Sequence, residues 1–91
     1  MELNLQMQDE LKRLSELSAK LKDVERFWTE LYTDRIKAEL SGAELHVLCN
    51  YSEQIRDAMF RIESLKDTIV EHVHILAGLY DAQLRTDGAK D

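Results

Sequence analysis

The stretch ELSGAEL, residues 39–45, lies near the centre of a chain whose other residues favour helices. It contains Gly42, which is the first glycine of the chain, and the next glycine is Gly78. The chain has no proline and is rich in Leu, Glu, Lys, Arg and Ala, so helix propensity is high on both sides of the stretch. Because glycine adopts tight-turn conformations readily, we predict a turn over residues 41–43.

The same stretch carries the signals of a helix start. Ser41 and Glu44 have the S-x-x-E spacing of a capping box, in which the two side chains cap backbone amides reciprocally. Leu40 and Leu45 occupy the two positions of the hydrophobic staple that accompanies such a box. We therefore predict that a second helix starts at about Gly42.

Apolar residues before the stretch recur at alternating spacings of three and four, which is the pattern of a heptad with apolar a and d positions. The a positions are Leu14, Leu21 and Trp28, and the d positions are Leu17, Val24 and Leu31. Extending the register adds Met7 and Arg35 at a, and Leu3, Glu10 and Ala38 at d. This pattern predicts a helix over about residues 2–40.

A second heptad follows the stretch. Its a positions are Leu48, Ile55, Ile62, Ile69 and Leu76. To its d positions we assign Leu45, Tyr51, Ala58, Leu65, His72 and Leu79. The pattern predicts a helix over about residues 42–84, followed by a frayed polar tail over residues 85–91.

The two heptads are out of phase with each other. Arg35 and Leu48, both at a, are thirteen residues apart, which is one fewer than two heptads. One continuous helix would rotate its apolar stripe at this point, so we expect the chain to fold back instead. The fold class is therefore all-α, with residues 1–91 forming one domain, an antiparallel two-helix coiled-coil hairpin.

Many apolar residues lie outside the two seams, and they are densest between Ile69 and Tyr80. A wide apolar stripe indicates burial against more than one neighbour. We therefore expect the hairpin to form a homodimer, which would be a four-helix bundle, or to dock onto another helical protein. The residues we predict to bind the partner are Phe27, Ile36, Phe60, Val70, Val73, Ile75 and Tyr80. Leu11, Tyr32 and Val47 are further apolar residues outside the seams.

Two polar residues fall at d positions that should face each other in the hairpin. Glu10 and His72 are predicted to form a buried polar pair near the open end. Such a pair commonly fixes the register of two helices. Because histidine titrates near neutrality, an alternative hypothesis is that this layer makes assembly sensitive to pH.

Glu71 and His74 have the Glu-x-x-His spacing that holds iron in some helical bundles. In this register they fall at c and f, which face away from the seam. We therefore predict neither a metal site nor a cofactor, and a metal-dependent bundle enzyme is our least favoured hypothesis.

Charge and composition disfavour several classes of partner. The formal net charge is −6, and acids outnumber bases in both halves of the chain, ten to seven and eight to five. Nucleic-acid binding and anionic membranes require a concentrated cationic face, so we expect neither. Cys49 is the one cysteine and should stay reduced, and the amino terminus lacks the pattern of a signal peptide. We expect one complete cytoplasmic domain.

The sequence contains no phosphate-binding loop, nucleophile elbow or zinc-type spacing. We therefore predict a non-enzymatic interaction protein with no small-molecule substrate, such as an adaptor, a small chaperone or a scaffold subunit. The alternative hypothesis is an acidic regulator or inhibitor that binds and blocks a partner protein.

The stretch ELSGAELHV, residues 39–47, resembles the ELS…EL helix start of the Hha-type bacterial expression modulators. The shared letters are mostly those of a capping box. This chain differs from that family in length and in its sustained heptads. The resemblance therefore implies a helix start and carries no function.

Overall fold

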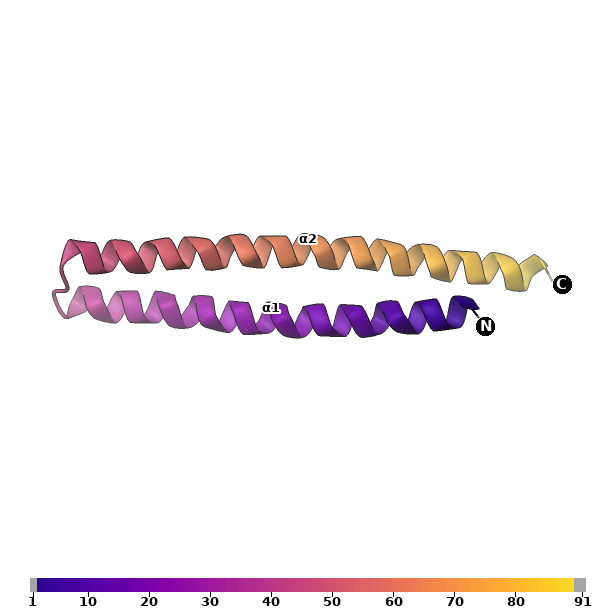
Figure 1. Cartoon of the computed structure of the whole chain (residues 1–91), viewed down its shortest axis with the longest axis horizontal. Helices are drawn as coiled ribbons and strands as arrows, with labels where there is room; N and C mark the ends of the chain where they lie inside the picture. Colours follow the sequence, from indigo (N-terminus) through magenta and orange to yellow (C-terminus); the bar gives the residue numbers. More distant parts are fainter. Residues whose placement is uncertain (1, 90–91) are drawn as a thin grey trace.

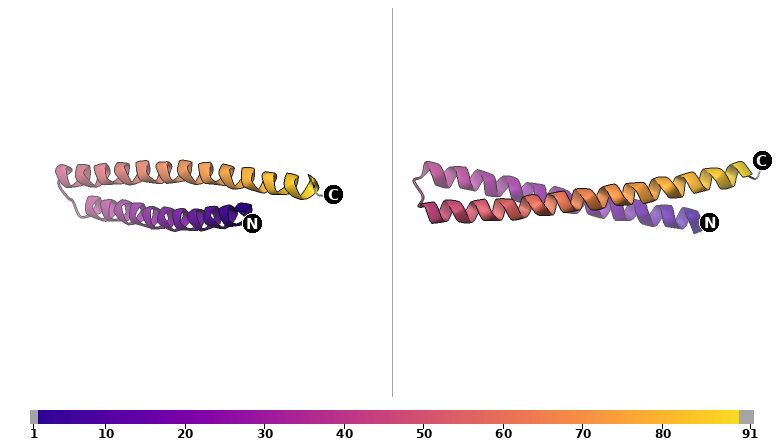
Figure 2. Two further views of the ribbon diagram at one scale, coloured as in Figure 1. Left: turned by 45° about the vertical axis from the view of Figure 1, so that its right-hand side comes forward. Right: turned by 90° about the horizontal axis from the view of Figure 1, so that it is seen from above.

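Two helices, α1 (Glu2–Leu40) and α2 (Leu45–Ala89), make up the computed structural model, which describes residues 2–89. They run antiparallel, side by side, and are joined by one short turn (Figure 1). The views in Figure 2 show that they cross at a shallow angle along their length. The hairpin measures 72 × 15 × 14 Å between Cα atoms, and α2 extends past the start of α1 (Figure 1). The predicted all-helical hairpin is confirmed.

The two heptad seams form the contact between the helices. In α1, every residue assigned to a or d is at least half-buried, and every other residue with a described side chain is exposed. In α2 the same assignment holds from Leu48 to Leu79, with a few half-buried neighbours outside the seam. Among the described residues, only three apolar side chains are buried, and these are Leu31, Ala58 and Ile62, with 2–6% exposure. The core is therefore a single narrow stripe.

The turn ends α1 with a Schellman motif. Gly42 has a φ of +78°, which is the left-handed conformation that glycine adopts at little cost. Its N–H donates to Glu39 O at 3.1 Å, and the Ala43 N–H donates to Ala38 O at 3.0 Å. These two bonds satisfy carbonyls that the end of a helix otherwise leaves unpaired.

The predicted capping box is wrong. The Ser41 hydroxyl donates to Lys37 O at 2.6 Å, and the Ser41 N–H donates to the same carbonyl at 3.0 Å. Ser41 therefore completes α1, because the left-handed glycine redirects the chain only after it. Glu44 is the N-cap of α2, since its carbonyl accepts the N–H groups of Val47 and Leu48 at 3.0 and 3.3 Å. The turn spans 41–44, and α2 starts at Leu45 rather than Gly42.

The predicted hydrophobic staple is also absent. Leu40 and Leu45 are 84% and 76% exposed, so neither is covered by the other. Our assignment of Leu45 to d was wrong as well. With Leu48 at a, the preceding d position belongs to Glu44, and Leu45 falls at e. One residue of displacement turns a side chain by about 100° on a helix, which takes Leu45 away from the seam.

The end of α2 differs from the predicted end at Leu84, whereas the fraying of residues 85–91 stays a prediction. α2 continues past Leu84 to Ala89. In this segment the Thr86 hydroxyl donates to Ala82 O at 2.9 Å, and Arg85 Nη2 lies 4.0 Å from Asp81 Oδ2. Without a proline, nothing stops the helix where the apolar pattern ends. Residues 90 and 91 lie outside the described residues.

Replacing Gly42 with alanine should destabilise the protein by about 1–2 kcal/mol, because an L-residue is strained at positive φ. The matched control is Gly78→Ala, which should stabilise it by about 0.5–1 kcal/mol, since Gly78 lies inside α2 and a Cβ there has open space. Urea unfolding at one fixed protein concentration measures both. Equal effects of the two substitutions would contradict the Schellman turn.

Candidate interaction surface

Fourteen large apolar side chains are between 44% and 84% exposed on the hairpin. All seven residues that the sequence predicts to bind a partner belong to this group: Phe27, Ile36, Phe60, Val70, Val73, Ile75 and Tyr80. The other seven are Leu5, Leu11, Tyr32, Leu40, Leu45, Met59 and Leu84. A surface with this much apolar area on a chain of 91 residues is a candidate for contact with another protein.

Two hydrogen bonds between the helices identify one flank of the seam. Arg35 Nε donates to Ser52 Oγ at 3.0 Å, and Gln83 Nε2 donates to Asn4 Oδ1 at 3.1 Å. Each bond joins an a residue of one helix to an e residue of the other. The e positions of both helices therefore lie on the same side of the seam. We call the residues at positions b and e of both helices the apolar flank, because most of the exposed large apolar side chains belong to it.

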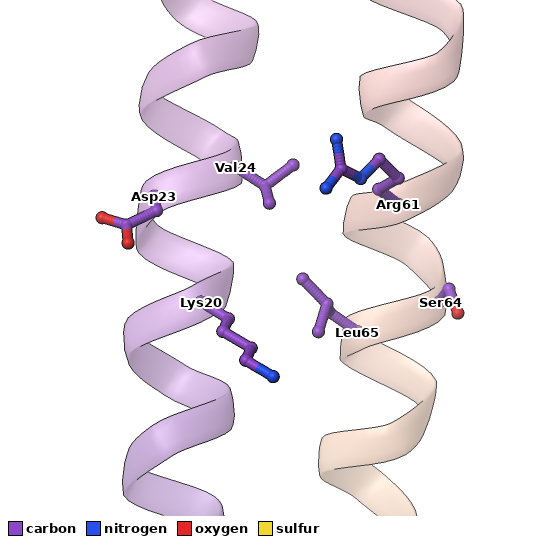
Figure 3. A pocket seen from close by; sticks show the side chains of 6 residues that line it. All are labelled: Lys20, Asp23, Val24, Arg61, Ser64 and Leu65. Carbon is purple, nitrogen blue, oxygen red and sulfur yellow. The ribbon is translucent and has the colours of Figure 1, made fainter.

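A shallow hollow identifies the opposite flank. It is lined from α1 by Lys20, Asp23 and Val24, and from α2 by Arg61, Ser64 and Leu65 (Figure 3). Val24 and Leu65 point into the space between the helices, whereas Asp23 points away from α2 (Figure 3). On each helix these residues occupy positions g, c and d. We call the residues at positions c and g the charged flank.

The exposed apolar side chains are divided unequally between the two flanks. Nine of the fourteen belong to the apolar flank, and these are Leu11, Tyr32, Ile36, Leu45, Met59, Val70, Val73, Tyr80 and Leu84. Only Phe27 and Ile75 belong to the charged flank, and Leu5, Leu40 and Phe60 lie at f, away from the seam. The sequence-based list missed this grouping, although heptad position assigns each residue to a row. Which rows adjoin depends on how the helices pair.

The apolar flank has two apolar ends and a charged middle. The open-end patch consists of Leu11, Val70, Val73, Tyr80 and Leu84. The turn-end patch consists of Tyr32, Ile36 and Leu45, with Met59 at its inner edge beside the exposed Arg56. Between them lies the central band, which consists of Lys22, Glu25, Glu63 and Lys66, all exposed.

Glu10 and His72 lie together on the seam near the open end. His72 Nδ1 is 2.7 Å from Glu10 Oε2, and the two side chains are 17% and 20% exposed. The pair is therefore half-buried rather than sealed. A hydrogen bond in one particular layer favours one register of the two helices over a shifted one, because a slip would leave both groups unpaired.

Two other seam residues carry polar groups. Arg35 bonds Ser52 and also lies 3.4 Å from Glu39 Oε2, so its charge reaches the surface. Trp28 packs against Tyr32, with ring centroids 5.3 Å apart and an interplanar angle of 44°. Trp28 Nε1 is buried and has no hydrogen-bond partner among the residues described.

Glu71 and His74 are exposed on the outer side of α2. Within residues 2–89, no group of three or more His, Cys, Asp or Glu side chains is arranged to hold a metal ion. His46 lies 3.2 Å from Glu44 at the exposed turn, and Cys49 is exposed with a free thiol. In the described part of the chain, neither helix contains a stretch apolar enough to cross a membrane.

Comparison with protein-family models, with curated proteins and with solved structures finds no match for this chain.

The contact between Glu10 and His72 should contribute about 1 kcal/mol of coupling energy to folding. A double-mutant cycle with Glu10→Ala and His72→Ala, followed by urea unfolding, measures it. The matched control is the exposed pair of Glu44 and His46, for which the same cycle should give no measurable coupling, since both side chains are at least 76% exposed. Additive effects of Glu10→Ala and His72→Ala would show that the contact does not specify the register.

Proposed function

We propose that this protein is a non-enzymatic interaction module that works through helix–helix packing, and that it associates with itself as a dimer of hairpins in a four-helix bundle. The observation that carries the proposal is the imbalance between three buried apolar side chains and fourteen large exposed ones among the residues described. A module of this kind would serve as an adaptor, a small chaperone or a scaffold subunit.

The energetics of the hairpin support association. Fully burying a leucine or isoleucine side chain contributes about 1.5–3 kcal/mol, and half-burial contributes less. Ordering long helices costs conformational entropy at every residue, and this cost is the same whether or not a partner is present. Because the seam covers only one stripe of each helix, a second layer of helices would add burial without ordering more backbone. Small helical chains commonly gain stability in this way.

The charge pattern favours this proposal over an acidic inhibitor of a basic protein. Along the charged flank of α1, acids and bases alternate from Asp9 through Arg13, Glu16 and Lys20 to Asp23. An inhibitor that occupies a cationic surface needs a continuous acidic face. Alternating signs give no such face, so the excess of acid over base here is spread rather than focused.

Light scattering coupled to size exclusion, across a range of protein concentrations, tests self-association. The expected mass at the higher concentrations is twice the 10.6 kDa of one chain. The urea midpoint should also rise with protein concentration, because association stabilises the folded form by mass action. A mass of one chain at every concentration, with a constant midpoint, would overturn the homodimer.

A further inference from the structure

The apolar flank has a pattern that complements itself when a second copy is turned end for end. We propose that this flank is the interface of the homodimer, and that the two hairpins stack with their turns at opposite ends. The inference rests on the self-association proposed above and specifies its surface and orientation. The occupant of the flank is a second copy of this chain.

A two-fold axis that lies in the interface, perpendicular to the long axis of the hairpin, generates this arrangement. It stacks α1 on α1 of the second copy and α2 on α2 of the second copy, each pair antiparallel. The open-end patch of each chain then covers the turn-end patch of the other. Each contact between the two patches therefore occurs twice in the dimer, once at each end, as an isologous interface requires.

The charges of the central band on α2 match this arrangement. Glu63 and Lys66 are three residues apart and occupy successive positions of the flank. In an antiparallel pair of α2 helices, Glu63 of each chain faces Lys66 of the other. The two-fold axis therefore gives two equivalent ion pairs between the α2 helices. None of the ion pairs found among the described residues uses these two side chains, so both are available to the second copy.

The same relation holds on α1 with the order reversed. Lys22 and Glu25 are also three residues apart on the flank, and each faces the other across the axis. The cross-helix bonds from Arg35 to Ser52 and from Gln83 to Asn4 set the level of one helix against the other. At that level, the midpoints of the two charged pairs lie within about two residues, or about 3 Å, of each other. One two-fold axis can therefore pair the charges of the central band on both helices.

The register that pairs Glu63 with Lys66 also seats the apolar residues of α2. Met59 then faces Val70 of the second copy, and Leu45 faces Leu84 of the second copy. Arg56 faces Val73 of the second copy. The aliphatic stem of Arg56 can cover Val73 while its guanidinium reaches water. The charges and the apolar patches thus select the same alignment, although they occupy different parts of the flank.

The register that pairs Lys22 with Glu25 seats two of the three exposed apolar residues of the flank on α1, whereas Tyr32 faces Ser15 of the second copy. Leu11 of one copy faces Ile36 of the other, which joins the open-end patch to the turn-end patch. Each helix therefore reaches this alignment from its own residues.

The alternative orientation is less favourable electrostatically. A two-fold axis along the hairpin would place both turns at one end and stack α1 on α2 of the second copy. Lys22 would then lie between Lys66 and Glu63 of the second copy, so attraction and repulsion would largely cancel. Only the end-for-end arrangement gives each charge of the central band a neighbour of opposite sign.

The flank is large enough for a stable dimer. A face with the length and width of this hairpin, 72 and 15 Å between Cα atoms, covers on the order of 1,000 Å² on each partner. Specific interfaces of ordinary size bury about 800 Å² per partner. Full contact along the flank would thus meet that requirement without further elements.

Chemical cross-linking tests the orientation with the native thiol of Cys49, which lies exposed at b near the turn. In the proposed dimer it lies close to Ala77 of the second copy, which is exposed at b near the open end. Ala77→Cys should therefore give covalent dimers with a short bis-maleimide, and digestion should map the link to residues 49 and 77. Within one chain these residues are about 42 Å apart along α2, so the link can form only between chains.

The matched control is Gly78→Cys, one residue away but on the charged flank, where a Cβ has open space. It should give at least tenfold less covalent dimer, and so should the unmodified chain, whose two Cys49 residues would be about 45 Å apart along the dimer. Equal linking in Gly78→Cys would overturn the assignment of the flank. A link between the two Cys49 residues would overturn the orientation.

Light scattering of two further variants gives an independent measurement. Val73 and Ile75 have the same 47% exposure but lie on the apolar and the charged flank, respectively. Val73→Lys should raise the dimer dissociation constant by about a hundredfold, because it would place a second cation against Arg56 of the second copy, whereas Ile75→Lys should change it less than threefold. Circular dichroism checks that both remain helical. If the unmodified chain is a dimer and both variants weaken it equally, the interface is wrong while self-association stands. If the unmodified chain is a monomer at every concentration, both the proposed interface and the proposed self-association are wrong.

Discussion

A hairpin of two helices can bury only one stripe of each helix, and this constraint governs the rest of the structure. The a and d residues of α1 and α2 form that stripe, and little of it is fully covered: Leu31, Ala58 and Ile62 are the only buried apolar residues described. The remaining circumference of each helix faces solvent. Apolar residues placed there gain nothing from the hairpin itself, so their number is evidence about what else the hairpin contacts.

The turn shows how one backbone angle redistributes local interactions. Gly42 takes a positive φ and closes a Schellman motif, so the helix that precedes it ends with its own carbonyls satisfied. Ser41 therefore bonds Lys37 O rather than a backbone amide of α2. The S-x-x-E spacing is compatible with a capping box, because it brings the two side chains within reach of each other's backbone amides. The φ angle of Gly42 decides which backbone groups these side chains actually meet.

The seam and the apolar flank are continuous with each other around Trp28. Its ring packs on Tyr32, which belongs to the turn-end patch, so a side chain on the flank covers a side chain of the core. The charged flank differs in kind on α1, where acids and bases alternate from Asp9 to Asp23 and all of them are exposed. This asymmetry gives the hairpin one side suited to further helix packing and one suited to solvent, which supports the proposed interaction module and a second copy as its partner.

The sequence by itself determined that there are two helices, where their seams run and that the chain folds back near Gly42. These are consequences of periodicity and of a one-residue phase slip, which are local properties of the chain. The facing of Glu10 and His72 also follows from register alone. The role of Ser41, the start of α2 at Leu45 and its extent to Ala89 depend on local backbone geometry that the heptad pattern does not specify, and the structure decided them. It also decided that Leu11, Val73 and Tyr32 share one flank, because rows on different helices adjoin only once the helices are paired.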